Sequence, residues 1–330
     1  MTTPLLTVQD LAVSFPGQSG PVRAVDGASF ELNPGGRLVI AGESGSGKSL
    51  LCRSLLGIQP ETATVSGKLE WKGQSLVSLS RDQWRPLRGA SIAMIFQDPT
   101  AALNPLLSVG RQIIDAIRAH RRCPRDEARA RAVEVLGMAG LPDPEHRLTN
   151  YPSELSGGMR QRVAIALALS AGPELIIADE ATTNLDVSIQ AQIVKLLRRL
   201  RLDLEVALIF VTHDLDLAAE VGGDLMVMYA GQPVEMGDVQ AVLADPCHPY
   251  TRGLLRSAPT LRTTREVPLQ PIPGQAPKPG SVGAGAPFRD RCPVAVEGVC
   301  ALQRPGWSQA APGHRVACHR FEKDGRAGLP

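Results

Sequence analysis

The sequence lacks the long apolar runs that a membrane-spanning helix needs. Its longest apolar run, near Val163 to Ala171, is about half of the roughly 18 residues that a span requires. The first residues, MTTPLLTVQD, also lack the basic segment and apolar stretch of a signal peptide. These absences predict a soluble, cytoplasmic chain, so that any membrane span would have to come from other chains.

The chain also has few cysteines and a small net charge. The chain has six cysteines in 330 residues, scattered until the last forty, which does not match a disulfide-stapled secreted domain. A net charge of +2 gives no reason to expect nucleic acid as the main partner. Hydrophobic residues make up 43% of the chain, which is ample for a packed core.

One stretch, residues 38–58, organises the rest of the chain. Its first four residues are apolar, as in a strand buried on both faces, and leucines at helical spacing end it. Between them the sequence matches G-x-x-x-x-G-K-S at every fixed position. Backbone N–H groups of such a loop curl around a polyphosphate at a helix N-terminus. The sequence therefore predicts a nucleotide site formed by Gly42, Glu43, Ser44, Gly45, Ser46, Gly47, Lys48, Ser49 and Leu50.

Within this site, Lys48 is expected to reach the β- and γ-phosphates, and the Ser49 hydroxyl to ligate Mg²⁺. Residues 5–15 and 22–32 alternate as strands do. Phe15 ends the first of these strands, where it either stacks on the adenine or belongs to the core. Both interpretations stay open.

A second group of polar residues follows other buried strands. Four apolar residues precede Asp179 and Glu180, which places both carboxylates at the carboxyl end of a parallel strand, where ligands bind. Asp179 is predicted to hold Mg²⁺, and Glu180 to polarise the attacking water. Gln97 ends another strand and is predicted to ligate Mg²⁺ or orient water. His213 ends a third and is predicted to contact the γ-phosphate and keep that water in line.

Residues 101–150 have helical periodicity and many charges, which predicts a helical insertion with a solvated basic face. A long apolar helix follows it, and Ser156, Gly157 and Gly158 stand at the start of that helix. A serine and two glycines at a helix N-terminus form a second anion-binding end in the same chain.

Together these motifs resemble an ABC-transporter ATPase: the loop at 42–49, Gln97, LSGG at 155–158, the strand and glutamate at 175–180, Asp186 and His213. The stretches FQDPTAALNPLLSVGRQI, ATTNLDVSIQAQI and HPYTRGLL are similar to those of the oligopeptide/dipeptide/nickel importer ATPases.

The resemblance implies an α/β P-loop NTPase fold with a RecA-like core, an antiparallel β subdomain, a helical insertion and a small C-terminal appendage. It implies an ATP-binding domain at 1–255, with its helical subdomain at about 98–162, and a Pro/Gly-rich linker with a cysteine-containing domain at 256–330.

The same resemblance implies an ATPase that uses ATP and Mg²⁺ at the cytoplasmic face of the inner membrane. Its expected partners are a second ATPase subunit, identical or different, two membrane permeases and, indirectly, an extracytoplasmic solute-binding protein, with no nucleic acid. In this family one subunit's loop and the other's signature sandwich the nucleotide. The residues expected to contact it in trans are Ser156, Gly157, Gly158 and Asp186.

The implied function is to energise the import of peptides or related small solutes, with nickel or a metal chelate as the alternative. A soluble ABC ATPase acting on DNA or ribosomes is a further alternative. The DNA-acting type separates these motifs by a long coiled coil, but only about a hundred residues, without sustained heptads, lie between Lys48 and Ser156. The ribosome-acting type carries two cassettes, and this chain has one.

The last segment carries Cys292, Cys300 and Cys318. They are either three free thiols or ligands of an iron–sulfur cluster, since thiolates gather around soft metals. The resemblance implies a fourth cysteine at the place of Ala286. Residues that could replace it are His314, His319 and Cys247.

Overall fold

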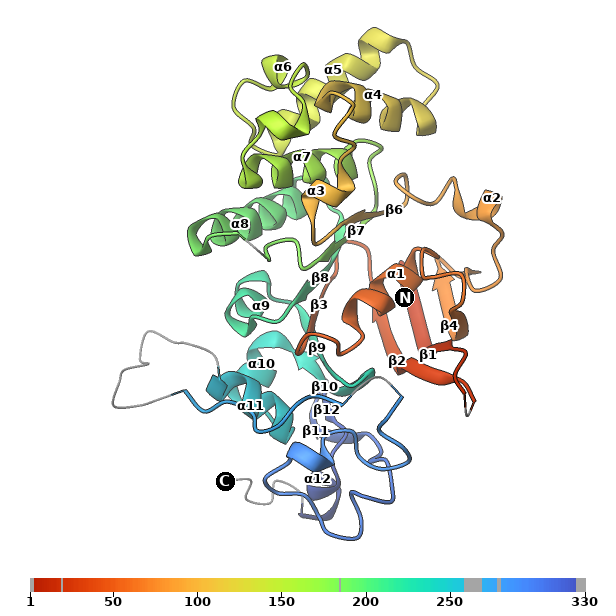
Figure 1. Cartoon of the computed structure of the whole chain (residues 1–330), viewed down its shortest axis with the longest axis vertical. Coiled ribbons are helices and arrows are strands. Elements are labelled where there is room, and N and C mark those ends of the chain that lie inside the picture. The colour runs from red at the N-terminus through yellow and green to blue at the C-terminus, as the bar shows by residue number, and fades with distance from the viewer. Residues whose placement is uncertain (1–2, 19, 184, 258–268, 278–279, 325–330) are drawn as a thin grey trace. The chain divides into compact units, whose positions relative to one another are not determined.

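The computed structural model describes residues 3–18, 20–183, 185–257, 269–277 and 280–324 (Figure 1). The chain divides into two compact units. The first unit comprises residues 1–32, 37–77 and 212–330, and the second comprises 33–36 and 78–211. The predicted domain division at residues 255 and 256 stays a prediction. No helix among the described residues is long and apolar enough to cross a membrane.

The first unit contains an antiparallel sheet in the order β2-β1-β4-β5. Its strands are β1 (Leu6–Phe15), β2 (Val22–Leu32), β4 (Thr64–Trp71) and β5 (Gln74–Ser75). The strands predicted at 5–15 and 22–32 are thus confirmed, and they pair with each other. This sheet is the expected antiparallel subdomain.

A second sheet in this unit is built around β3 (Arg37–Ala41), which runs parallel to β9 (Asp224–Tyr229). The strands β10 (Gln232–Asp238), β12 (His314–Val316) and β11 (Ser308–Ala311) continue it in antiparallel fashion. Two strands near the end of the chain therefore extend the sheet that contains β3. The helices of this unit are α1 (Lys48–Leu55), α9 (Leu215–Val221), α10 (Val239–Ala244), α11 (Pro249–Ser257), η2 (Arg289–Arg291) and α12 (His319–Asp324).

The second unit has three parallel strands, β6 (Ile92–Ile95), β7 (Leu175–Asp179) and β8 (Ala207–Thr212). Every residue of these strands is buried, as their continuous apolar runs predict. The helices are α2 (Arg81–Trp84), α3 (Pro99–Ala102), α4 (Val109–His120), α5 (Arg125–Met138), α6 (Pro144–Arg147), η1 (Pro152–Glu154), α7 (Gly157–Leu169) and α8 (Val187–Leu204).

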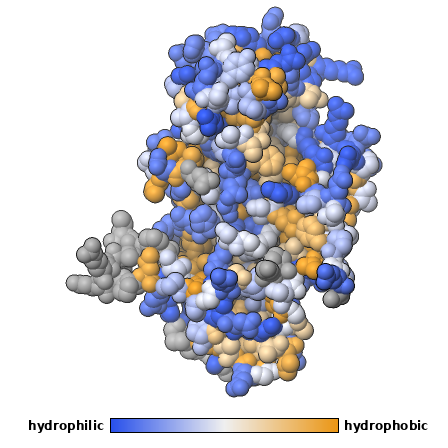
Figure 2. Space-filling view, viewed as in Figure 1, coloured by the Kyte–Doolittle hydropathy of each residue, from blue (hydrophilic) through white to orange (hydrophobic). Residues whose placement is uncertain are grey.

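Helix α4 of the helical insertion forms because its sequence gives it one apolar face. In α4, the side-chain oxygen of Ser108 accepts a hydrogen bond from the backbone N–H of Arg111, and Ile113 and Ile117 are buried one turn apart. Burying each isoleucine contributes about 1.5–3 kcal/mol. Outward, the surface over α4 to α6 is mostly hydrophilic (Figure 2).

Candidate active site

The glycine-rich loop connects β3 to α1 in the first unit. Its backbone bends where Gly42, Gly45 and Gly47 have φ of 150°, 77° and 97°. A Cβ at Gly47 would lie 2.8 Å from the carbonyl oxygen of Ala24, so that position has neither the conformation nor the space for a side chain. No side chain caps α1 at Gly47. The loop therefore ends at a helix N-terminus without a side-chain cap, which suits an anion site.

Lys48 lies inside this loop with only 4% of its surface exposed. Its Nζ donates hydrogen bonds of 2.8 Å to the carbonyl oxygens of Gly42 and Glu43. Ser46 Oγ lies 3.4 Å from the same nitrogen. The ammonium group is thus held where the loop converges.

Two residues that the sequence did not reveal contact the same loop. Tyr250 Oη accepts a hydrogen bond of 2.7 Å from the backbone N–H of Glu43, and Arg291 forms an ion pair with the Glu43 carboxylate. Neither lies in a motif for nucleotide binding; Tyr250 falls in the HPYTRGLL stretch. Elsewhere in this unit, Phe15 is half-buried at the end of β1, and His213 is exposed directly after β8.

In the second unit, Asp179 and Glu180 are buried at the carboxyl end of β7, 2% and 8% exposed. Glu180 has φ of 46°, in the left-handed region that non-glycine residues seldom adopt. Its backbone N–H bonds to the carbonyl oxygen of Val211, 3.2 Å away. Such local strain persists where surrounding contacts enforce it, and it gathers at active sites.

The structure brings Gln97 and Glu180 together, although 83 positions separate them. Gln97 Nε2 donates to Glu180 Oε2 over 2.9 Å, and Thr183 Oγ1 donates to the same oxygen over 3.2 Å. Two donors on one oxygen fix the orientation of the carboxylate. The roles predicted for Gln97 and Glu180 in hydrolysis stay predictions.

The residues expected to act in trans lie at two neighbouring helix N-termini of the second unit. Ser156 Oγ caps α7 by accepting from the Met159 N–H, and Asp186 immediately precedes α8. A Cβ at Gly158 would lie 3.3 Å from Ile189 of α8, which shows how closely the two helix starts approach. Ser156 and Asp186 are exposed, so both ends are accessible to another molecule.

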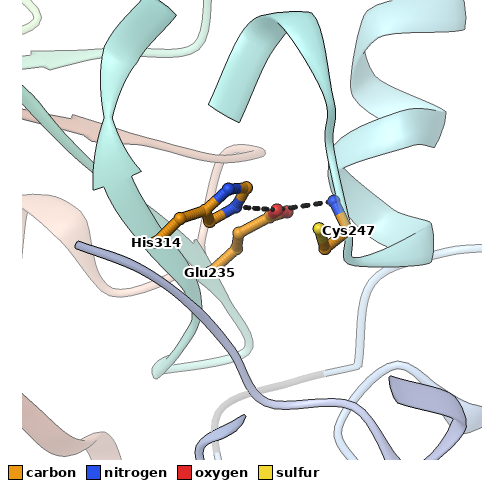
Figure 3. Close-up of side chains that lie close together, drawn as sticks. All are labelled: Glu235, Cys247 and His314. Atoms are coloured by element: carbon orange, nitrogen blue, oxygen red, sulfur yellow. Dashed lines mark hydrogen bonds and ion pairs between the residues drawn. The ribbon is translucent and has the colours of Figure 1, made fainter. Parts of the chain in front are cut away.

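Near the end of the chain, Glu235, Cys247 and His314 form the one group among the described residues whose ligand atoms are close enough to share a metal ion (Figure 3). Glu235 is fully buried. Its carboxylate accepts hydrogen bonds from the backbone N–H groups of Cys247 and His248, at 2.6 and 3.0 Å, and lies 2.8 Å from His314 Nε2. These bonds satisfy the carboxylate without a metal and tie β10, β12 and the segment before α11 together.

The predicted cysteine ligands are not in that group, and His314 is engaged with Glu235 instead of with them. Burial raises the pKa of the Cys292 thiol to about 11 and also raises that of Cys318. The backbone N–H of Val296 donates to Cys300 Sγ over 3.3 Å.

Two of the residues suggested as a fourth ligand have other contacts. Cys247 packs with Val316 and Cys318 in a small apolar cluster. His319 Nε2 lies 3.0 Å from the carbonyl oxygen of Gln303. Ala286 bonds through its N–H to the carbonyl oxygen of Cys300, at 2.8 Å, so the expected fourth position does lie beside a cysteine.

A glycine loop with a buried lysine, an acidic pair after a buried strand and a serine-capped glycine helix define a P-loop ATPase of the cassette type. The family model for the ABC transporter matches residues 25–183, and that for the oligopeptide/dipeptide transporter C-terminal region matches residues 234–300. The chain belongs to the ATP-binding subunits of ABC transporters, within the oligopeptide/dipeptide group, and it is an ATPase.

Relatives of known name agree with this assignment. The chain is 48% identical over 318 residues to the probable peptide ABC transporter ATP-binding protein y4tR of Sinorhizobium fredii, covering 96% of this chain and 95% of that protein. It is 44% identical over 316 residues to the dipeptide transport ATP-binding protein DppD of Escherichia coli, covering 96% of both. Among solved structures, the dimeric ATP-binding cassette MJ0796 with ADP and Pi matches 71% of this chain and 98% of its own, at 26% identity and a TM-score of 0.63.

Proposed function

We propose that this chain hydrolyses ATP to energise the import of peptides or related small solutes through a membrane ABC transporter. The observation that carries the proposal is the 48% identity, over 96% of this chain, to a probable peptide ABC transporter ATP-binding protein. The chain also has the glycine loop with its buried lysine and the acidic pair after β7. Nickel or metal-chelate import by the same machinery has no comparable support in the structure.

For nucleotide binding, the proposed contacts are the backbone of the loop from Gly42 to Leu50 and the Lys48 ammonium group. Lys48 already bridges two loop carbonyls, and a γ-phosphate is a stronger acceptor for that ammonium. Phe15 is proposed to stack on the adenine. Mg²⁺ would neutralise the phosphate charge, and the oxygens that suit it are those of Ser49, Gln97 and Asp179.

For hydrolysis, Glu180 is proposed as the group that accepts a proton from the attacking water. Its carboxylate is buried, and Gln97 and Thr183 fix its orientation. His213 is proposed to contact the γ-phosphate and hold the water in line.

The nucleotide on one subunit is proposed to be completed in trans by a second ATPase subunit. The exposed helix starts at Ser156–Gly158 and Asp186 offer backbone N–H groups to a phosphate. The similarity to a dimeric cassette supports this arrangement. The second subunit is either a copy of this chain or a different ATPase, and in both cases it must supply its own glycine loop.

Membrane permeases are the proposed partners of the segment after Gln97. There Leu106 is 82% exposed and Leu107 is 38% exposed, while Leu103 is buried at 2%; Phe96, directly before Gln97, is also 38% exposed. Exposed apolar side chains close to the hydrolysis residues suit docking of a permease helix. The assembly would lie at the cytoplasmic face of the inner membrane and receive solute from an extracytoplasmic binding protein.

We also propose that Cys292, Cys300 and Cys318 hold an iron–sulfur cluster. Besides the Val296 contact, backbone N–H groups bond the thiols of Cys292 and Cys318, as they do around metal-bound thiolates. A cluster would replace the protons that burial keeps on these thiols.

The test of hydrolysis uses Glu180→Gln in the full chain. This change keeps the shape of the side chain and removes its basicity, so ATP binding should persist while turnover falls by about 10²–10⁴-fold. Lys48→Ala should weaken ATP binding itself. Hydrolysis by Glu180→Gln at a near wild-type rate would show that the base has been assigned wrongly.

A further inference from the structure

Glu43, the second residue of the glycine loop, is held by a residue 248 positions away. Arg291 forms a bidentate ion pair with its carboxylate: Nη1 lies 2.6 Å from Oε2, and Nη2 lies 3.0 Å from Oε1. The arginine side chain is only 6% exposed. The Glu43 side chain is 30% exposed, so water reaches the pair from the carboxylate side, and two parallel bonds fix its geometry.

Every N–H donor of the Arg291 guanidinium makes a hydrogen bond. Besides the two bonds to Glu43, Nη1 donates to Tyr229 Oη, Nη2 to the carbonyl oxygen of Ile272 and Nε to that of Pro273, at 3.2, 3.3 and 2.8 Å. An arginine has five N–H donors, and each has a partner here. Apart from the loop, two separate parts of the chain hold Arg291, namely Tyr229 and the segment Ile272–Pro273, so Arg291 can position the loop.

The backbone of Glu43 is held from both sides as well. Its N–H donates to Tyr250 Oη, and its carbonyl oxygen accepts from Lys48 Nζ, at 2.7 and 2.8 Å. Tyr250 is fully buried, and its ring packs 4.6 Å from that of Tyr229 and 5.3 Å from that of Phe288. Burial raises the pKa of its hydroxyl, which stays protonated.

These contacts form a chain that ends at the phosphate-binding lysine. Arg291 and Tyr250 fix Glu43, and the carbonyl oxygen of Glu43 is one of the two that hold the Lys48 ammonium group. We propose that Arg291 and Tyr250 are positioning residues for the ATP site, which act through Glu43 on Lys48 and so set the affinity for ATP. The inference rests on the proposed nucleotide site and adds a dependence on the C-terminal segment.

The experiment measures Mg-ATP binding, and KM and kcat for hydrolysis, in the full chain. Arg291→Gln should raise the dissociation constant and KM for ATP about tenfold while kcat changes less than about twofold, because the loop shifts but Glu180 does not. For Arg291→Lys, KM for ATP should lie between the values of wild type and Arg291→Gln, since lysine keeps the charge but cannot form the bidentate ion pair. Glu43→Gln combined with Arg291→Gln should be little worse than either change alone.

Arg304→Gln is the matched control. Arg304 also joins the C-terminal segment to the core by two hydrogen bonds to one residue, with Nη1 2.7 Å from Asp26 Oδ2 and Nη2 3.0 Å from its carbonyl oxygen. Neither bond is to a residue of the loop, and the further connection from Asp26 to Ser46 by way of Gly231 is made by backbone atoms, which the substitution leaves unchanged. Arg304→Gln should therefore leave KM for ATP unchanged, even where it lowers the melting temperature.

Equal KM values for wild type, Arg291→Gln and Tyr250→Phe would overturn the inference. If Arg291→Gln does not fold, Tyr250→Phe decides alone, because it removes one hydroxyl and keeps the ring; it should raise KM severalfold. Lys48→Ala separates this outcome from a failure of the proposed function. If Lys48→Ala abolishes binding and the Arg291 and Tyr250 variants do not affect it, only the positioning role is wrong.

Discussion

His248 is expected to make the protein less stable in mild acid. It is 5% exposed, and its Nδ1 accepts a hydrogen bond of 3.1 Å from the backbone N–H of Tyr250. A proton on Nδ1 would remove that acceptor and place a charge in a buried position. Burial therefore lowers the pKa of His248 from 6.5 to about 4, although the charge of Glu235 opposes the change.

The size and sign of the effect follow from these two values. Between pH 6.5 and about pH 4 the unfolded chain binds a proton at this position and the folded chain does not. The contribution of His248 is therefore complete above pH 6.5 and declines as the pH falls. Over the whole range the free energy of unfolding drops by about 3 kcal/mol, and at pH 5 by about 2 kcal/mol.

The assay is urea unfolding at pH 7.5 and pH 5, for wild type and His248→Asn. The Asn Oδ1 can accept the Tyr250 N–H but does not titrate, so the variant should lose about 2 kcal/mol less than wild type between the two conditions. His146→Gln, at an exposed histidine, should behave like wild type. Identical pH dependence in wild type and His248→Asn would refute the reasoning.

Two further predictions concern the permease and the cysteines. A cysteine at Leu106 should cross-link to a permease subunit in the assembled transporter, whereas one at Leu202, 64% exposed near the end of α8, should not; cross-links confined to residues 292–318 would contradict the docking site. Protein purified without oxygen should contain iron and sulfide, and more of both in Ala286→Cys, because that change supplies a fourth thiol; absence of iron from both would exclude a cluster.

The sequence predicted the features that arise from short stretches of chain. The buried runs of β3, β6, β7 and β8, the serine cap of α7 and the glycine loop each depend on a few consecutive residues. The Gln97–Glu180 contact could also have been predicted, because parallel strands bring their carboxyl ends to one edge of the sheet. The pairing of β12 with β10 and the Glu235 network could not, since they join residues about 80 positions apart that share no periodicity.

The glycine loop illustrates why a local motif does not by itself fix a site. Its eight residues specify a backbone that can surround a phosphate. The position of that backbone also depends on contacts with other segments: Gly47 packs closely against the carbonyl oxygen of Ala24, and Tyr250 and Arg291 bind Glu43. Each contact comes from a different part of the first unit. A deletion of the whole C-terminal segment would remove Arg291 together with β11 and β12, and would confound loop geometry with sheet stability. Single substitutions at the contact atoms separate the two, because β12 pairs with β10 and does not depend on the Arg291 guanidinium.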